Sequence, residues 1–360
     1  MKSFRIYVLA GLFVLLIPFP ALAQEDLLNH YYAGKYDQVI AATSVTIAAG
    51  DTSFSSYYLK ALSESQLGRT EDAIATLQKV QEIFPDDSRI IRMLASQFYE
   101  AGDYVKARNH YSELVRTDST DVASWLKLAE ISSFRQQYEQ SIAALEQVLI
   151  IDSLNLNSLM MMGNILNRHN NSGAVVYYVR AYEIYPDNQK VAYALGNWYI
   201  QAREPWNTVL ICEQILESDP LSIKFLKLQG YAYYKMGDPG PAISHFQKAI
   251  ALGDSSTFTF KFMGISQYLA IEFEEAIASL QKGIEKDSAD AEIQFFLGAS
   301  LANTTRKEEA MDHLDRSLEL MKPDPAVISR IYSEQGNIMR LETDYKRAYE
   351  LYEKSWEADT

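Results

Sequence analysis

The chain has 360 residues, a formal net charge of −14 and a single cysteine. So acidic a protein lacks the positive field that non-specific binding to nucleic acid or to anionic membranes requires, which argues against both functions. One cysteine cannot form an intrachain disulfide, so stability must come from packing.

The first residues, MKSFRIYVLAGLFVLLIPFPALA, have the pattern of a secretory signal peptide. Lys2 and Arg5 precede an apolar run that is too short for a comfortable membrane span, and Ala-Leu-Ala before Gln24 suits signal peptidase. We therefore predict that residues 1–23 are removed, which changes the formal charge from −14 to −16. An uncleaved anchor is the alternative. Gln24 in place of cysteine argues against a bacterial lipoprotein, and no later stretch is long and apolar enough to span a bilayer.

A pattern of about 34 residues repeats along the rest of the chain. Blocks such as KLQGYAYYKMGDPGPAISHFQKAIALGD, from Lys227, show two runs with apolar residues near the helical period, separated by a short turn. A small residue beside a large one recurs in the first run: Ala95, Ala129, Gly163, Gly196, Gly230, Gly264, Gly298 and Gly336. A second small residue follows about twelve positions later: Ala107, Ser141, Ala174, Thr208, Ala242, Ala276, Ala310 and Ala348.

The small residues have a mechanical reason. Two helices approach closely only where no bulky side chain intervenes, so both series are predicted to mark contacts between helices. A large residue four positions after the second small residue is expected to fill the adjoining hole: Tyr111, Leu145, Phe246, Leu280, Leu314 and Tyr352. Several repeats end near a proline, which cannot continue a helix.

This pattern resembles the tetratricopeptide-repeat family, and the resemblance covers residues 24–360 as about ten repeats, the first one partial. It implies an all-α fold, an α-solenoid in which helix–turn–helix pairs wind into a right-handed superhelix. The last link, MKPDPAVIS, is longer than the others, so Asp324 is predicted to cap a lengthened helix that begins at Pro325. The expected repeat starts are Gln24, Phe54, Ser88, Val122, Leu156, Gln189, Ile223, Thr257, Ala291 and Pro325.

Residues that could carry chemistry are few. Cys212 occupies a large-residue position of its repeat and is interpreted as a packing residue. His110, His245 and His313 share one repeat position but lie whole repeats apart, so they cannot share a metal ion and are predicted to be exposed. No catalytic, phosphate-binding or metal-binding motif occurs. We therefore predict no enzymatic activity, no catalytic residues, no metal and no cofactor.

The resemblance also implies a binding surface. In the family, the first helix of each repeat lines the inner groove, mainly through its second, fifth, ninth, twelfth and thirteenth positions. Asn and Lys on neighbouring first helices resemble the clamp that some members use to hold a peptide carboxylate, although that clamp has both residues in one repeat, whereas Asn197 precedes Lys224 and Lys227. Ordinary solvated surface is the alternative. The predicted groove residues are Arg89, Arg92, Asn164, Asn167, Arg168, Lys190, Tyr193, Asn197, Lys224, Lys227, Tyr231, Tyr234 and Lys261.

A second surface is predicted on the last helix. Tyr345, Tyr349, Tyr352 and Trp356 form a stripe at i, i+4, i+7 and i+11. In an internal repeat this face packs against the next repeat. We therefore expect the stripe to dock on another subunit or partner, or on the same end of a second copy as a homo-oligomer. Partial burial against its own repeat is the alternative.

The predicted function is that of a non-catalytic scaffold or adaptor of the cell envelope. It would bind an extended acidic or carboxylate-bearing segment of a partner protein in its concave groove, with no nucleic-acid partner. The signal pattern predicts export across the inner membrane to a bacterial periplasm. Two alternatives stay open: an accessory subunit that activates a separate envelope enzyme, such as a glycosyltransferase or cell-wall hydrolase, and a module that binds a small ligand or glycan.

Overall fold

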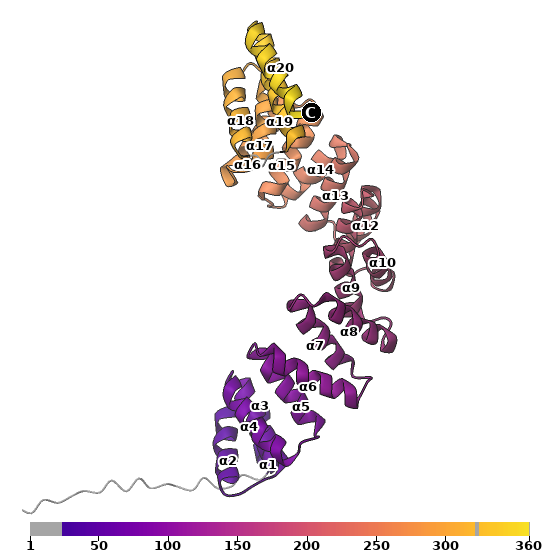
Figure 1. Cartoon of the computed structure of the whole chain (residues 1–360), viewed down its shortest axis with the longest axis vertical. Helices are drawn as coiled ribbons and strands as arrows, with labels where there is room; N and C mark the ends of the chain where they lie inside the picture. Colours follow the sequence, from indigo (N-terminus) through magenta and orange to yellow (C-terminus); the bar gives the residue numbers. More distant parts are fainter. Residues whose placement is uncertain (1–23, 321–323, 360) are drawn as a thin grey trace, which may run out of the picture. The chain divides into compact units, whose positions relative to one another are not determined.

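A computed structural model of the protein describes residues 24–320 and 324–359, so the predicted signal peptide lies outside the described residues. The described residues form twenty α-helices and no strand, which confirms the all-α prediction (Figure 1). Contacts divide the chain into two compact units, Met1–Ile165 and Leu166–Thr360, and the division falls within α9. No described helix combines the length and the apolar character needed to cross a bilayer.

The helices alternate between the first and the second member of a pair. The first unit holds α1 (Gln24–Tyr32), α2 (Tyr36–Ala48), α3 (Phe54–Gln66), α4 (Thr70–Ile83), α5 (Ser88–Glu100), α6 (Tyr104–Thr117), α7 (Val122–Phe134), α8 (Tyr138–Ile151) and most of α9 (Leu156–Arg168). The second unit holds α10 (Ala174–Ile184), α11 (Gln189–Gln201), α12 (Pro205–Ser218), α13 (Ile223–Met236), α14 (Pro239–Ala251), α15 (Thr257–Leu269), α16 (Phe273–Lys286), α17 (Ala291–Ala302), α18 (Lys307–Leu320), α19 (Pro325–Leu341) and α20 (Tyr345–Asp359).

Each of the ten residues predicted to open a repeat is the first residue of an odd-numbered helix. The lengthened helix near the C-terminus is also confirmed, because α19 has 17 residues where α15 has 13. Asp324 caps α19 by accepting a hydrogen bond from the Ala326 N–H at 3.1 Å, and Pro325 is the first helical residue. The local capping signals therefore set these helix boundaries as expected.

The small residues of the first series lie at close contacts between helices. A methyl group at Gly264 would lie 2.6 Å from Leu280 Cγ, and one at Gly336 would lie 2.7 Å from the Tyr352 ring. At Gly230 the nearest atoms belong to the Phe246 ring, 3.1 Å away. The large residues therefore fill the space that the glycines leave, as predicted, and only a missing side chain permits this approach.

Two members of the second series of small residues, Thr208 and Ser141, carry a hydroxyl group and form a hydrogen bond between helices. Thr208 Oγ1 donates to the Gly196 carbonyl at 2.8 Å, and Ser141 Oγ donates to the Ala129 carbonyl at the same distance. Both hydroxyl-bearing residues are fully buried, so each hydroxyl needs a partner. These bonds join the two helices of a pair at their closest point.

Within the second unit, the first helices of successive repeats also contact one another. α11, α13, α15, α17 and α19 each touch the next in turn, while α12, α14, α16 and α18 pack against the first helix on either side. The odd-numbered helices therefore form a continuous layer, as expected of an α-solenoid. This layer carries the predicted groove residues from Lys190 to Lys261.

Candidate functional site

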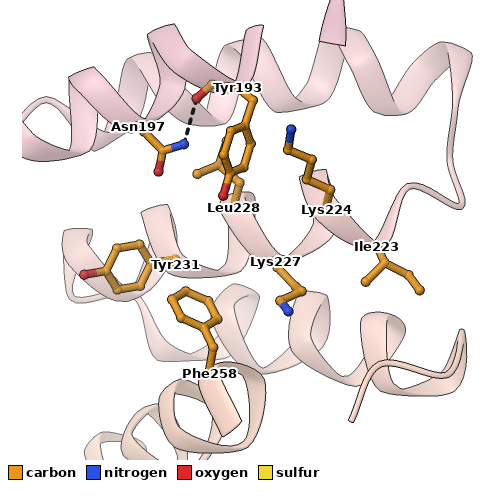
Figure 2. Close-up of a pocket in the computed structure, with 8 residues that line it drawn as sticks. All are labelled: Tyr193, Asn197, Ile223, Lys224, Lys227, Leu228, Tyr231 and Phe258. Atoms are coloured by element: carbon orange, nitrogen blue, oxygen red, sulfur yellow. Dashed lines mark hydrogen bonds between the residues drawn. The ribbon is translucent and has the colours of Figure 1, made fainter. Parts of the chain in front are cut away.

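Three neighbouring first helices of the second unit enclose a pocket of 480 Å³, which Figure 2 shows in close-up. α11 contributes two of its residues, α13 contributes five and α15 contributes one. Five of these residues were predicted from sequence to line a groove: Tyr193, Asn197, Lys224, Lys227 and Tyr231. The remaining three are Ile223, Leu228 and Phe258.

Leu228 is the buried member of the pocket and links it to the packing of the repeats. Its side chain is 4% exposed and lies over Gly196, where a methyl group would come within 3.1 Å of Leu228 Cδ2. The glycine therefore lets α13 approach α11 closely. The same contact that packs two repeats places an apolar residue in the pocket.

The two α11 residues are held by contacts within the second unit. Asn197 Nδ2 donates to the Tyr193 carbonyl at 2.7 Å, as the dashed line in Figure 2 marks, which leaves Oδ1 as the atom that could accept a hydrogen bond from a ligand. The Tyr193 ring meets the Phe225 ring edge-on, with centroids 6.2 Å apart. Both side chains are therefore oriented before anything binds.

Lys224 supplies an uncompensated positive charge. Its Nζ lies 3.7 Å from the centroid of the Tyr193 ring, a cation–π contact. Burial lowers the pKa of Lys224, and the nearby charge of Lys190 lowers it further. In the described part of the chain, neither lysine has a carboxylate within ion-pair distance. An anion placed between them would relieve their repulsion.

Lys227 differs from Lys224 because its charge is already paired. Its Nζ lies 3.2 Å from Asp254 Oδ1 and donates to Ser256 Oγ at 2.7 Å. Burial raises the pKa of Asp254, but hydrogen bonds from Thr259, Ser256 and Lys227 outweigh that effect and hold the pKa below its ordinary value. Asp254 is therefore ionised and neutralises Lys227 at neutral pH.

The pairing of Lys227 follows a rule that other repeats share. Lys227, Arg92 and Lys261 each occupy the fifth position of a first helix. Arg92 pairs with Asp121, the N-cap of α7, at 2.7 Å, and Lys261 pairs with Asp290, the N-cap of α17, at 2.8 Å. Fifth-position cations therefore join one first helix to the start of the next.

Aromatic rings line the α15 side of the pocket. The Tyr231 ring meets the Phe258 ring at 5.3 Å between centroids and the Phe262 ring at 4.6 Å. Tyr231 and Phe258 line the pocket itself. Such rings offer rigid contact area at a low cost in side-chain entropy.

The other predicted groove residues lie outside this pocket. Arg89, Arg92 and Asn164 belong to the first unit, and Asn167, Arg168, Lys190, Tyr234 and Lys261 belong to the second. Arg89 pairs with Asp87 at 2.6 Å, and its guanidinium lies 3.9 Å from the centroid of the Phe54 ring. Lys261 is paired twice, with Asp290 and with Glu292, each at 2.8 Å. Most of these cations are thus occupied by the protein's own carboxylates or rings.

Three pocket residues were not predicted. Ile223 and Leu228 lie beside predicted positions, and no pattern in the sequence separates them from ordinary core residues. Phe258 could have been found, because it holds the second position of α15, as Lys190 does on α11 and Lys224 on α13. It was not predicted because only polar residues and tyrosines were considered as groove residues.

The four residues of the predicted C-terminal stripe differ in their surroundings in the structure. Tyr352 packs against Gly336 and donates to Asn337 Oδ1 at 2.8 Å, so it belongs to its own repeat. Tyr345, Tyr349 and Trp356 are 66%, 68% and 71% exposed. In three internal repeats the residue at the position of Tyr349 is buried, namely Val209, Ile243 and Ile277.

The prediction that three histidines are exposed is wrong. His110, His245 and His313 are each half-buried, because an aromatic ring or a side-chain amide covers each one. The first stacks on Phe98 at 5.6 Å between centroids. Burial lowers the pKa of all three histidines. They are neutral packing residues at pH 7.

Cys212 is fully buried, and burial raises the pKa of its thiol. A buried thiol with a raised pKa is a poor nucleophile and a poor metal ligand. Among the described residues, no group of three or more His, Cys, Asp or Glu side chains is arranged to hold a metal ion. The packing interpretation of Cys212 agrees with this environment.

Comparisons with known proteins give two family matches. Residues 47–227 match the family described as the C-terminal ARM domain of tetratricopeptide repeat protein 21. Residues 270–326 match the tetratricopeptide repeat itself.

Individual proteins share only part of their length with the chain. Human protein O-mannosyl-transferase TMTC1 is 27% identical over 125 residues, which are 34% of this chain and 14% of that protein. The peroxisomal targeting signal receptor of Kluyveromyces lactis is 24% identical over 210 residues, 58% of this chain and 32% of that protein. The crystal structure of the APC/C hetero-tetramer Cut9–Hcn1 matches with a TM-score of 0.47 and 15% identity over 88% of this chain and 58% of that one. The chain thus spans a third or less of these two curated relatives.

Proposed function

The chain belongs to the tetratricopeptide-repeat family, and from that premise we propose that it is a non-catalytic adaptor whose second unit binds an extended, carboxylate-bearing segment of a partner protein. The proposed binding site is the pocket between α11, α13 and α15. A relative of the chain is a targeting signal receptor by name, which is consistent with recognition of a polypeptide segment.

The observation that carries the proposal is the unpaired charge of Lys224 in an otherwise acidic protein of net charge −14. No Asp or Glu lines the pocket, and Lys190 adds a second positive charge close to Lys224. Among the described residues, the groove cations Arg89, Arg92, Lys227 and Lys261 pair with the protein's own carboxylates, whereas Lys190 and Lys224 do not. A partner carboxylate would supply the counter-ion that the protein does not provide.

The remaining pocket residues favour a polypeptide over a free small acid. Asn197 Oδ1 is positioned to accept a hydrogen bond from a main-chain N–H, and Tyr193 offers a fixed ring beside it. A volume of 480 Å³ suits one or two side chains together with a stretch of backbone. The aromatic lining of Tyr231 and Phe258 would contact the apolar parts of such a segment.

We further propose a place of action in the cell envelope, in the periplasm of a bacterium, on the strength of the signal pattern before Gln24. N-terminal sequencing of the protein recovered from a periplasmic extract would test this. A mature chain that starts at Gln24 supports export and cleavage. An intact N-terminus in the cytoplasmic fraction contradicts it.

Two other functions compete for the same surface. Tyr231 and Phe258 could stack on a sugar ring, which favours a glycan-binding module, and an adaptor that binds a glycosyltransferase or cell-wall hydrolase could act as its activating subunit. The glycan-binding function does not explain why Lys224 lacks an acidic neighbour, because neutral sugars need no counter-ion. An activating subunit would still bind its enzyme as a protein partner. The molecule that co-purifies with the protein, a polypeptide or a glycan, distinguishes these functions.

The test is affinity purification of the tagged full-length protein from its native source. We expect a stoichiometric protein partner that is lost when Lys190 and Lys224 are both changed to Glu. The matched control changes Lys248 and Lys282 to Glu, since these exposed lysines lie on second helices, α14 and α16, with the same change in charge. Equal capture by both double variants would contradict the proposed site, and recovery of glycan without protein would contradict the adaptor function.

A further inference from the structure

A second pocket adjoins the first and shares Tyr231 with it. It has a volume of 520 Å³ and lies between the C-terminal half of α11, the start of α12 and the end of α13. Its lining residues are Ile200, Gln201, Arg203, Pro205, Tyr231 and Lys235. We call the two pockets together the α13 trench, because both lie along the same face of α13.

The α13 trench carries positive charge at both ends. Lys224 lies in the first pocket, and Lys235 and Arg203 line the second. No Asp or Glu lines either pocket, and in the described residues no carboxylate lies within ion-pair distance of Lys235. The Lys235 Nζ lies 5.1 Å from the centroid of the Tyr231 ring. The neighbour of this ammonium group is therefore an aromatic ring, which does not neutralise its charge. The trench is thus complementary to two anions rather than one.

The spacing of these charges follows from helix geometry. Lys224 and Lys235 are eleven residues apart on α13, a rise of about 16 Å, and Leu228 lies about 6 Å along the axis from Lys224. An extended chain advances about 3.3 Å per residue and points alternate side chains to the same face. Side chains at i, i+2 and i+4 of such a chain therefore lie on one face and span about 13 Å. The flexible side chains of the two lysines can cover the difference between this span and the rise from Lys224 to Lys235.

We propose that the α13 trench recognises an extended segment of the form acid–x–apolar–x–acid, in which Lys224 and Lys235 bind the two carboxylates and the apolar side chain lies over Leu228 between Tyr193 and Phe258. This inference rests on the proposed function and specifies the partner sequence. The apolar side chain faces residues that already form the apolar part of the first pocket. A helical segment does not suit the site in the same way, because its carboxylates would have to lie eleven residues apart to match the two lysines.

The experiment measures binding of synthetic peptides to the purified full-length protein by fluorescence anisotropy. The probe is the blocked, labelled peptide Gly-Ser-Glu-Ser-Phe-Ser-Glu-Ser-Gly. Three variants of the peptide replace the second Glu by Gln, replace Phe by Ser, or bring the two Glu together while the composition is kept. The protein variants are Lys224→Gln, Lys235→Gln and, as a control outside the trench, Lys248→Gln.

The expected result is a coupling between Lys235 and the second Glu. Lys235→Gln should weaken binding of the parent peptide about fivefold and leave binding of the second-Glu→Gln peptide unchanged, since the partner charge is already absent. Loss of Phe, or the two Glu placed together, should weaken binding by a similar factor. Lys248→Gln should change nothing.

Other outcomes separate this inference from the proposed function. Binding that depends on Lys224 but shows no coupling between Lys235 and the second Glu overturns the inference and leaves the proposed site intact. If the peptide with adjacent Glu residues binds as tightly as the parent peptide, the attraction does not depend on the spacing of the carboxylates. This result also overturns the inference. If no peptide binds at millimolar concentration, the inference is overturned, while capture of the native partner still decides the proposed function.

Discussion

Lys227 on α13 lies 3.2 Å from Asp254, in the loop before α15, whereas Lys224, one turn earlier on the same helix, faces no carboxylate. The two lysines therefore have different roles, although the sequence presents them alike. Lys227 joins two repeats. Lys224 remains available to a ligand.

This division predicts different effects of removing each lysine. Lys227→Met should lower the free energy of unfolding by about 1–2 kcal/mol, because Asp254 would lose a charged partner in a site where its side chain is only 12% exposed. Lys224→Met should leave stability nearly unchanged, since no ion pair is broken and the lost contact with the Tyr193 ring is offset by the removal of the repulsion from Lys190. Urea denaturation followed by circular dichroism measures both. A loss of stability as large in Lys224→Met would show that the distinction is wrong.

The close approach of helices at the glycines predicts a contrast between two Gly→Ala variants. Gly264→Ala should destabilise the protein by about 1–3 kcal/mol, since the new methyl group would lie 2.6 Å from Leu280 Cγ. Gly240, in α14, has no atom within 4 Å of such a methyl group, so Gly240→Ala should be neutral or stabilising by up to about 1 kcal/mol. Thermal melting of the two variants provides the comparison. If Gly264→Ala melts at or above the wild-type temperature, the packing argument does not hold.

The buried thiol predicts slow modification of Cys212. A thiol reagent such as dithionitrobenzoate should react with the folded protein at least about a hundredfold more slowly than with the protein in denaturant, because the side chain is fully buried and its pKa is raised. Cys212→Ala should leave partner capture unchanged. Rapid reaction of the native protein would instead point to a reactive cysteine.

The exposed aromatic residues of α20 predict association through the C-terminal repeat. We expect the purified protein to show concentration-dependent self-association by light scattering, and Trp356→Glu should abolish it. Trp206→Glu is the matched control, since Trp206 is 56% exposed on α12 and lies outside the stripe. A wild-type protein that stays monomeric at high concentration would contradict self-association and leave docking on a different partner as the use of this face.

The repeat pattern predicted the fold well because its signals are local. Each helix start depends on residues within a turn or two of it, and the contact of Gly264 with Leu280 joins two helices of one pair. The expected position of Pro325 and its cap is correct for the same reason. Such features recur in every repeat and can be checked against one another.

The site was harder to predict because it depends on contacts between repeats. The partner of Lys227, Asp254, lies 27 residues away, in the loop that leads to the next repeat. The sequence alone does not show that Lys227 has such a partner and Lys224 has none. His110 was expected to be exposed, but the Phe98 ring of the preceding helix covers it. Phe258 was passed over because it is apolar, although its repeat position matches that of Lys224. The pocket therefore had to be assembled from the structure.

Photocrosslinking from within the pocket tests the central claim most directly. Tyr193 is replaced by benzoylphenylalanine in the full-length protein, and Trp206, exposed on a second helix, is replaced in the same way as a control. After irradiation in the native source, mass spectrometry identifies the attached peptide. We predict a crosslink from position 193 to a segment of one partner protein that carries acidic residues, and none to that segment from position 206. Crosslinking of the same partner from position 206 but not from 193, or attachment at 193 to a segment without a carboxylate, would contradict the account.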